Sequence, residues 1–156
     1  MSDTDGLSRV RADAQARGIP IEIRERPAAR SLEEAAAILG IEPREIAKSI
    51  VMRAGSDQYL FAIVPGDASV LFAKVRALLG VNKLKFPSAD EVFAAVGYER
   101  GTITPLGSVQ PLPVYVDSSL TGRRVSMGAG AHGYSVFVEV DDLVRGLDAV
   151  VADIAG

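Results

Sequence analysis

Ala47-Lys48-Ser49-Ile50-Val51-Met52-Arg53 and, shortly after it, Tyr59-Leu60-Phe61-Ala62-Ile63-Val64 are the two stretches on which the fold depends. Both are apolar runs of strand length, and Ala54-Gly55-Ser56-Asp57 between them has the composition of a turn. We therefore predict a β-hairpin. Because continuous apolar runs are typical of strands covered on both faces, we expect this hairpin to lie in the middle of its sheet.

Helical and strand patterns alternate around the hairpin. Helices are predicted over residues 6–17, 31–40, 69–79, 88–97 and 141–146, with Ser69 and either Asp141 or Asp142 among the N-caps. Short strands are predicted over residues 21–24, 83–86, 114–117, 124–127, 134–140 and 150–154. Since mostly antiparallel hairpins and helices interleave without a steady βαβ order, the sequence predicts the α+β class.

The composition limits the classes of function. The chain has 156 residues, 48% of them apolar, which predicts a single globular domain. It contains no cysteine and one histidine, which argues against disulfides, thiolate chemistry and a multi-histidine metal site. No apolar run approaches the roughly 20 residues of a membrane span, and the acidic start lacks a signal sequence, so we expect a cytoplasmic protein. The net charge of −3 argues against nucleic-acid binding by overall charge alone.

Gly101-Thr102-Ile103-Thr104-Pro105-Leu106-Gly107, the 101–107 loop, fits neither helix nor strand. Glycine at each end permits backbone angles closed to other residues, and Pro105 restricts Thr104 to an extended conformation. A segment of this kind can hold backbone N–H groups in a fixed array that binds a carbonyl or an anion. Local composition favours a plain connecting loop, so the functional interpretation depends on the rest of the chain.

Gly128-x-Gly130-x-x-Gly133 matches the dinucleotide-binding fingerprint literally. That fingerprint requires a helix directly after the last glycine, so that the helix N-terminus meets the pyrophosphate. The following residues, Tyr134-Ser-Val-Phe-Val-Glu-Val, have strand character. We therefore predict a glycine-rich hairpin turn, and only a helix after Gly133 would revive an oxidoreductase.

Lys48 is the most unusual polar residue, because it lies in an apolar strand on the face that it shares with Ile46 and Ile50. A lysine on a core-directed face is costly unless its ammonium reaches a cleft or an anion. Two interpretations stay open on the sequence. The lysine either extends from a strand end to solvent or directs a cation at a phosphate or a developing oxyanion.

Other polar residues give weaker signals. His132 is predicted to be an exposed turn residue, and no Gly-x-Ser-x-Gly elbow singles out a nucleophilic serine. Basic residues at several positions are expected to form a solvated face, with a phosphate-contacting rim as the alternative. They are Lys74, Arg76, Lys83, Lys85, Arg123 and Arg124.

Motifs along most of the chain share their order and spacing with one family. They comprise residues 47–51, 60–67, 97–98, Gly101-x-x-x-Pro105-Leu-Gly107, 112–114, Asp117, Gly130-x-x-Gly133, 141–143 and 152–154. Over about residues 28–155 the chain resembles the YbaK/prolyl-tRNA-synthetase-associated editing domains, which are free-standing aminoacyl-tRNA deacylases. The resemblance implies one compact domain with a mixed, mostly antiparallel curved sheet flanked by helices. Residues 1–27 would add a helix and a strand to the editing domain of residues 28–156.

The resemblance also implies a reaction. It is hydrolysis of the ester between a mischarged amino acid and the 3′-terminal adenosine of tRNA, with Cys-tRNA(Pro) or Ala-tRNA(Pro) as substrate, prolyl-tRNA synthetase as a partner, and no cofactor or metal. Water or the substrate's own groups would attack the ester. By position, the implied catalytic residues are Lys48, Gly101 and Pro105. The implied substrate-binding residues are Ser49, Ile103, Thr104, Gly130 and His132.

Two departures from the family pattern leave the substrate open. Ser49 stands where members often carry Thr or Asn, and His132-Gly133 stands where the cysteinyl type usually has Arg-Gly or Lys-Gly. A second class of function also stays open, a non-catalytic module that binds a small molecule or a synthetase surface. In either case we expect Lys48 and the 101–107 loop to form one wall of a pocket and the glycine turn of residues 128–133 to form its opposite rim.

Overall fold

The predicted hairpin lies in the middle of the larger of two sheets. The computed structural model describes residues 3–156, and in it the two hairpin strands pair antiparallel, with Lys48 opposite Val64 and Ser49 opposite Ile63. The neighbours on one side pair in parallel, while the short edge strand on the other side is antiparallel. In sheet order the strands are β4 (Leu84–Lys85), β2 (Ala47–Ala54), β3 (Gln58–Pro65), β5 (Val114–Asp117) and β8 (Val150–Ala152).

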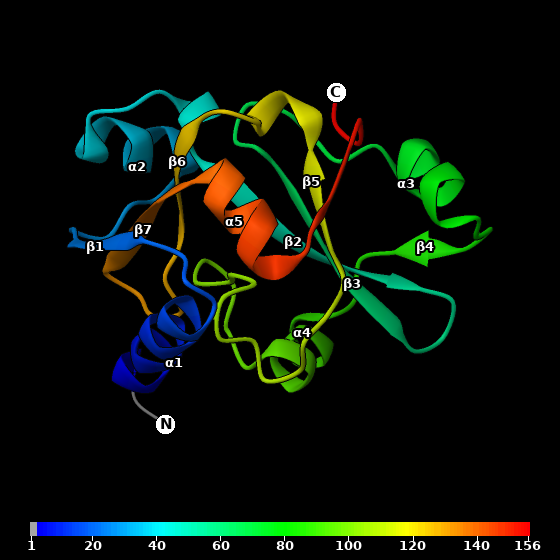
Figure 1. Cartoon of the computed structure of the whole chain (residues 1–156), viewed down its shortest axis with the longest axis horizontal. Coiled ribbons are helices and arrows are strands. Elements are labelled where there is room, and N and C mark those ends of the chain that lie inside the picture. Colours follow the sequence, from blue (N-terminus) through cyan, green and yellow to red (C-terminus); the bar gives the residue numbers. More distant parts are fainter. Residues whose placement is uncertain (1–2) are drawn as a thin grey trace.

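The smaller sheet joins an N-terminal strand to two strands from the last third of the chain (Figure 1). Its strands are antiparallel, in the order β1 (Ile21–Glu25), β7 (Tyr134–Glu139) and β6 (Arg124–Gly128). A bridge between Ile46 and Ser126 connects it to the start of β2. Because β7 begins directly after Gly133, the glycine turn is a hairpin turn as predicted, and the oxidoreductase alternative is excluded.

Helices cover both sheets, and the described chain has two apolar clusters. The helices are α1 (Asp3–Ala16), α2 (Leu32–Leu39), α3 (Phe72–Leu79), α4 (Ala89–Val96) and α5 (Val140–Leu147), with 3₁₀ turns η1 (Pro43–Glu45) and η2 (Ser118–Leu120). Phe61 and Ile63 of β3 face the larger cluster, with α1, α4 and α5, whereas Ala62 and Val64 face a smaller cluster with α3. The hairpin is therefore covered on both faces, and the predicted α+β class is confirmed. No helix within residues 3–156 combines the length and apolar content needed to cross a bilayer.

The predicted start of α3 is wrong. Ser69 does not cap the helix, which begins at Phe72. The backbone before it pairs instead with the end of the chain, since Ser69 N donates to Gly156 O at 3.1 Å and Leu71 N donates to Ile154 O at 2.8 Å. A tertiary pairing thus takes the residues that local sequence assigns to a helical turn.

The predicted start of α5 is also wrong. The helix begins at Val140 with Glu139 as N-cap, so Asp141 and Asp142 lie in its first turn, where carboxylates complement the helix dipole. Asp141 Oδ1 accepts a hydrogen bond from Gly122 N at 3.0 Å. The side chain expected to cap its own helix therefore holds a neighbouring turn.

Candidate functional site

A cavity of about 620 Å³ lies where the two sheets meet. Its walls are the start of β2, the segment leading into α2, the first part of the 101–107 loop, the end of β6 and the start of β7. Five predicted site residues line it, namely Lys48, Ser49, Gly101, Ile103 and His132. The structure therefore brings both predicted halves of the site together, although Thr104, Pro105 and Gly130 lie outside the wall.

The cavity is lined by cations. Arg26, Arg30, Lys48 and Arg100 contribute to its walls, and none of its lining residues is Asp or Glu. Carboxylates occur only beyond the lining, as in the ion pair of Arg30 with Glu34 at 3.6 Å. Since the whole chain carries a net charge of −3, positive charge is concentrated at this cavity against the overall balance.

Lys48 reaches its half-buried position from the smaller-cluster face of β2. Its Nζ donates a hydrogen bond to the carbonyl oxygen of Ala68, in the segment that follows β3. One of three ammonium donors is thereby fixed to the protein, which leaves two for a ligand. The partner explains how an apolar strand accommodates a charge at this position.

Ser49 lines the same cavity and has an unsatisfied hydroxyl. Its Oγ is buried and has no hydrogen-bond partner within residues 3–156. A buried polar atom without a partner costs about 1–3 kcal/mol and is uncommon in native proteins. With no base in contact the hydroxyl is not set up as a nucleophile, but it is free to bond a ligand.

The 101–107 loop offers backbone donors at its first end. Gly101 has a φ of +89°, which suits glycine, and is exposed. Thr102 N donates to Glu99 O at 3.0 Å, whereas the N–H groups of Gly101 and Ile103 donate to no acceptor within residues 3–156. The two cavity-lining residues of the loop therefore have N–H groups available for a ligand.

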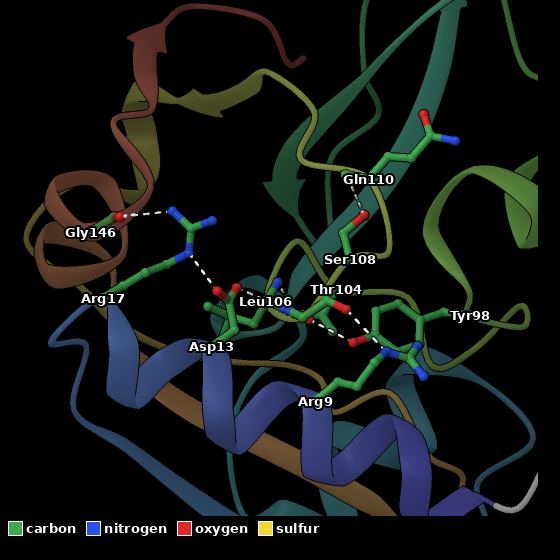
Figure 2. A network of polar contacts seen from close by, with 10 residues as sticks. Arg9, Asp13, Arg17, Tyr98, Thr104, Leu106, Ser108, Gln110 and Gly146 are labelled. Atoms are coloured by element: carbon green, nitrogen blue, oxygen red, sulfur yellow. Dashed lines mark hydrogen bonds and ion pairs between the residues drawn. The ribbon is translucent and has the colours of Figure 1, made fainter.

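The C-terminal end of the loop is held by hydrogen bonds to α1 and to Tyr98, as Figure 2 shows. Gly107 N donates to Asp13 Oδ2 at 2.8 Å, and Arg9 Nε donates to Gly107 O at 3.2 Å. Tyr98 lies beneath the Arg9 guanidinium and donates its hydroxyl to Leu106 O at 2.7 Å. Burial raises the pKa of Tyr98 to about 12, so this donor stays protonated at neutral pH.

The glycine turn lies beside the loop rather than across the cavity from it. Gly130 N donates to Thr102 O at 2.9 Å, and a Cβ on Gly128 would lie 2.2 Å from Ile103 O. The expected opposite rim is therefore wrong, because glycine at position 128 lets the two backbones touch. Another part of the cavity wall is formed by α2 and the segment before it.

His132 is exposed at the mouth of the cavity, as predicted for a turn residue. Its Nε2 lies 3.2 Å from Glu99 Oε2, and its Cε1 would lie 3.9 Å from a Cβ built on Gly101. The imidazole thus stands over the first end of the loop, at the point where a ligand would enter.

Comparison with known families identifies this arrangement. A family model described as the aminoacyl-tRNA editing domain matches residues 26–145, which is well over half of the chain. The chain belongs to this family. The editing domain is 35% identical over 121 residues to the proline--tRNA ligase of Shouchella clausii and 32% identical over 106 residues to that of Bacillus licheniformis. These matches cover 77% and 68% of this chain but 21% and 18% of the ligases, so the chain matches about a fifth of their length.

Solved structures share the fold. The editing domain superposes on the crystal structure of a hypothetical protein with a TM-score of 0.89 at 27% identity, covering 95% of this chain and 99% of the other. It superposes on a protein proposed to be a trans-editing enzyme for prolyl-tRNA synthetase with a TM-score of 0.88 at 28% identity, covering 97% of each chain. The predicted family resemblance is confirmed.

Sequence reasoning missed part of the editing domain's cavity. Arg26, Arg30 and Arg100 line it, whereas the basic residues weighed from sequence are elsewhere; Lys74 pairs with Asp153 at 2.7 Å and Arg124 with Glu22 at 2.8 Å. Arg100 could have been suspected, because it directly precedes the 101–107 loop. No local signal marks Arg26, whose Nε donates to Ser135 Oγ at 2.8 Å across the smaller sheet.

Proposed function

We propose that this editing domain hydrolyses mischarged aminoacyl-tRNA in trans, with Cys-tRNA(Pro) or Ala-tRNA(Pro) as substrate. The observation that carries the proposal is the cationic cavity, whose lining includes Lys48 together with Gly101 and Ile103, two residues whose N–H groups donate to no acceptor within residues 3–156. A polyanionic 3′ end suits a cavity lined by Lys and Arg without carboxylates. The likeness to proline--tRNA ligases supports tRNA(Pro) as the carrier.

The chemistry requires charge stabilisation more than a protein nucleophile. A water oxygen attacks the ester carbonyl carbon, and the former carbonyl oxygen becomes an oxyanion. The oxyanion then re-forms the carbonyl as the bond from that carbon to the ribose oxygen breaks, the proton given up by the attacking water passes to the ribose oxygen, and the free amino acid and the tRNA separate. We assign the N–H groups of Gly101 and Ile103 to the oxyanion and Lys48 to the 3′-terminal nucleotide.

The remaining predicted residues have supporting roles in this proposal. Ser49 Oγ, which lacks a protein partner, bonds the aminoacyl group, and His132 with Glu99 contacts the substrate at the mouth. Pro105 and Thr104 are buried behind the wall, and Thr104 Oγ1 accepts from Leu106 N at 3.2 Å, so they act by fixing the loop. Gly130 acts by holding the glycine turn against Thr102.

A deacylation panel tests the proposal. Purified protein is incubated with tRNA(Pro) charged with Cys, Ala or Ser, and the loss of ester is followed over time. We expect Lys48→Ala to lower kcat/KM at least about 100-fold, because it removes the cation that holds the 3′-terminal nucleotide in position for the reaction. We expect Lys83→Ala, which removes an exposed lysine outside the cavity, to leave it unchanged.

The outcomes separate the role of Lys48 from the function as a whole. Full activity in Lys48→Ala, with unchanged circular dichroism and thermal midpoint, would refute the role given to Lys48. Equal ester loss with and without the wild-type protein across the panel would refute the deacylase and favour a binding module on the same cavity.

A further inference from the structure

A second, smaller cavity opens beside the first. It has a volume of about 210 Å³ and shares Ser49, Ile50, Arg100 and Ile103 with the larger one. Because the two cavities have these walls in common, a ligand that fills the first can continue into the second without leaving the surface. The second cavity is not needed for the ester chemistry proposed above, so its contents require a separate explanation.

An aromatic ring dominates the outer wall of this second cavity. Phe86 is 57% exposed, which is unusual for a residue of this size, and lies between β4 and the start of α4. Its ring meets Phe72 edge to face, with centroids 4.9 Å apart and an interplanar angle of 87°. Pro87 follows it and fixes the backbone at that point. The ring is thus in contact with Phe72 while more than half of the residue stays open to solvent.

The lining has the character of a stacking site. Beyond Phe86 and Pro87 it consists of apolar residues from β2, α4 and the 101–107 loop together with Ser49 and Arg100, and none of the described residues that line it is Asp or Glu. Unpaired bases bind proteins by stacking on aromatic rings while basic side chains contact the backbone phosphates. A purely apolar protein segment would not require Arg100 at this position.

We propose that the second cavity binds the unpaired nucleotide that precedes the terminal adenosine of the tRNA, with its base stacked on Phe86 and its 3′ phosphate on Arg100. This inference rests on the proposed function, since it assumes that the aminoacylated adenosine occupies the larger cavity. The shared residues then lie where the chain of the RNA passes from one cavity to the other. Recognition of this nucleotide adds affinity without taking part in the reaction.

Substrates of two lengths test the stacking site. The amino acid that the wild-type protein removes is attached to adenosine alone and to the trinucleotide CCA, and kcat/KM is measured for both. We expect Phe86→Leu to lower kcat/KM about tenfold for aminoacyl-CCA and to leave aminoacyl-adenosine unchanged, because stacking is lost only for the longer substrate. Phe86→Trp keeps an aromatic face and is expected to retain activity on both.

Phe93→Leu is the matched control. Phe93 is 45% exposed on α4 and lines neither cavity, so its replacement is expected to change neither value. Equal losses on both substrates in Phe86→Leu, or no loss on either, would overturn the proposal.

A binding measurement separates this inference from the deacylase itself. If the wild-type protein hydrolyses none of the substrates, the proposed function fails, and binding of a 5′-labelled oligonucleotide ending in CCA decides the stacking site. Weaker binding by Phe86→Leu, with normal binding by Phe93→Leu, supports it. Equal binding by both variants and the wild type overturns it.

Discussion

The two ends of the 101–107 loop differ in how they are held. At the first end, Gly101 and Ile103 line the cavity with N–H groups that have no acceptor in the described chain. At the other end, Leu106 and Gly107 are buried or half-buried and are bonded to Tyr98, Arg9 and Asp13. One short segment therefore combines an open end and a fastened end.

The difference indicates how a flexible-looking loop can serve as a preorganised site. Donors that stabilise a developing charge are effective when they need no reorganisation during the reaction. The hydrogen bonds at positions 106 and 107 fix the loop, and this leaves the donors at 101 and 103 free of internal partners. The hydrogen bonds to Gly107 involve Arg9 and Asp13 of α1. This helix precedes residues 26–145, the part of the chain that the family model matches.

Among the tests of this comparison, replacing Gly107 is expected to give the largest loss in the free energy of unfolding. A Cβ there would lie 2.6 Å from Tyr98 Oη and 2.7 Å from Arg9 C, at a φ of +72°. We expect Gly107→Ala to lower the free energy of unfolding by about 3 kcal/mol or more, since backbone clash and strain add. Gly122→Ala, with φ of +74° and no atom within 4 Å, isolates the strain alone and is expected to cost about 1 kcal/mol. Urea unfolding measures both, and equal losses would contradict a fastened end.

Removing the Asp13 carboxylate is expected to have an intermediate effect. Asp13→Ala leaves the Gly107 N–H without its acceptor, so we expect a loss of about 2 kcal/mol in urea unfolding and a fall of about tenfold in kcat of deacylation as the loop loosens. Arg17→Met removes the partly exposed ion pair with Asp13 but keeps the acceptor, and is expected to cost less than about 0.5 kcal/mol. Unchanged kcat in Asp13→Ala would show that the two ends act independently.

The smallest expected effect is a loss of stability at alkaline pH. The pKa of Tyr98 is raised by burial to about 12, above its value in the unfolded chain, so its contribution to stability is complete below about pH 10 and is lost as the pH rises through 12. Between pH 9 and pH 11 we expect the wild type to lose about 1 kcal/mol more than Tyr98→Phe, which has no proton to release there. Denaturant unfolding at the two pH values compares the proteins. Parallel losses would contradict a buried, bonded hydroxyl.

Local sequence was enough to predict most of the elements. Apolar runs and a turn predicted the hairpin of β2 and β3, and the strand character after Gly133 predicted a hairpin turn in place of a dinucleotide-binding site. Lys48 stood out because a charge in an apolar strand needs a reason. These inferences depend on period and propensity, which local residues express directly.

Hydrogen bonds between residues far apart in the sequence could not be predicted by the same reasoning. Asp117 is the N-cap of η2 and accepts from Ser119 N at 3.2 Å, but its Oδ1 also accepts from Ile154 N at 2.9 Å and Ala155 N at 3.0 Å. Burial alone would raise the pKa of Asp117, but the hydrogen bonds from Ser119 and these backbone groups outweigh it and lower the pKa below its usual value. No sequence pattern near Asp117 predicts hydrogen bonds to residues so distant in the chain.

The cationic lining was missed for a related reason. Arg26 and Arg30 precede Arg100 by about 70 residues, and all three line the cavity where the two sheets join at the start of β2. The basic residues Lys74, Arg76, Lys83 and Lys85, which are also close together in sequence, do not line it. Closeness along the chain therefore did not tell which basic residues contribute to a site between two sheets.

The pairing of β1 with β7, at Ile21 and Val138, also sets the order in which the molecule can be completed during synthesis. A ribosome releases α1 and β1 long before β7 exists, and contacts between such distant segments form slowly because a long loop must close first. Since His132 and Ser135 also belong to the cavity wall, a nascent chain has no complete cavity until β7 emerges. Truncated products of interrupted translation that end before β7 would therefore lack a complete cavity.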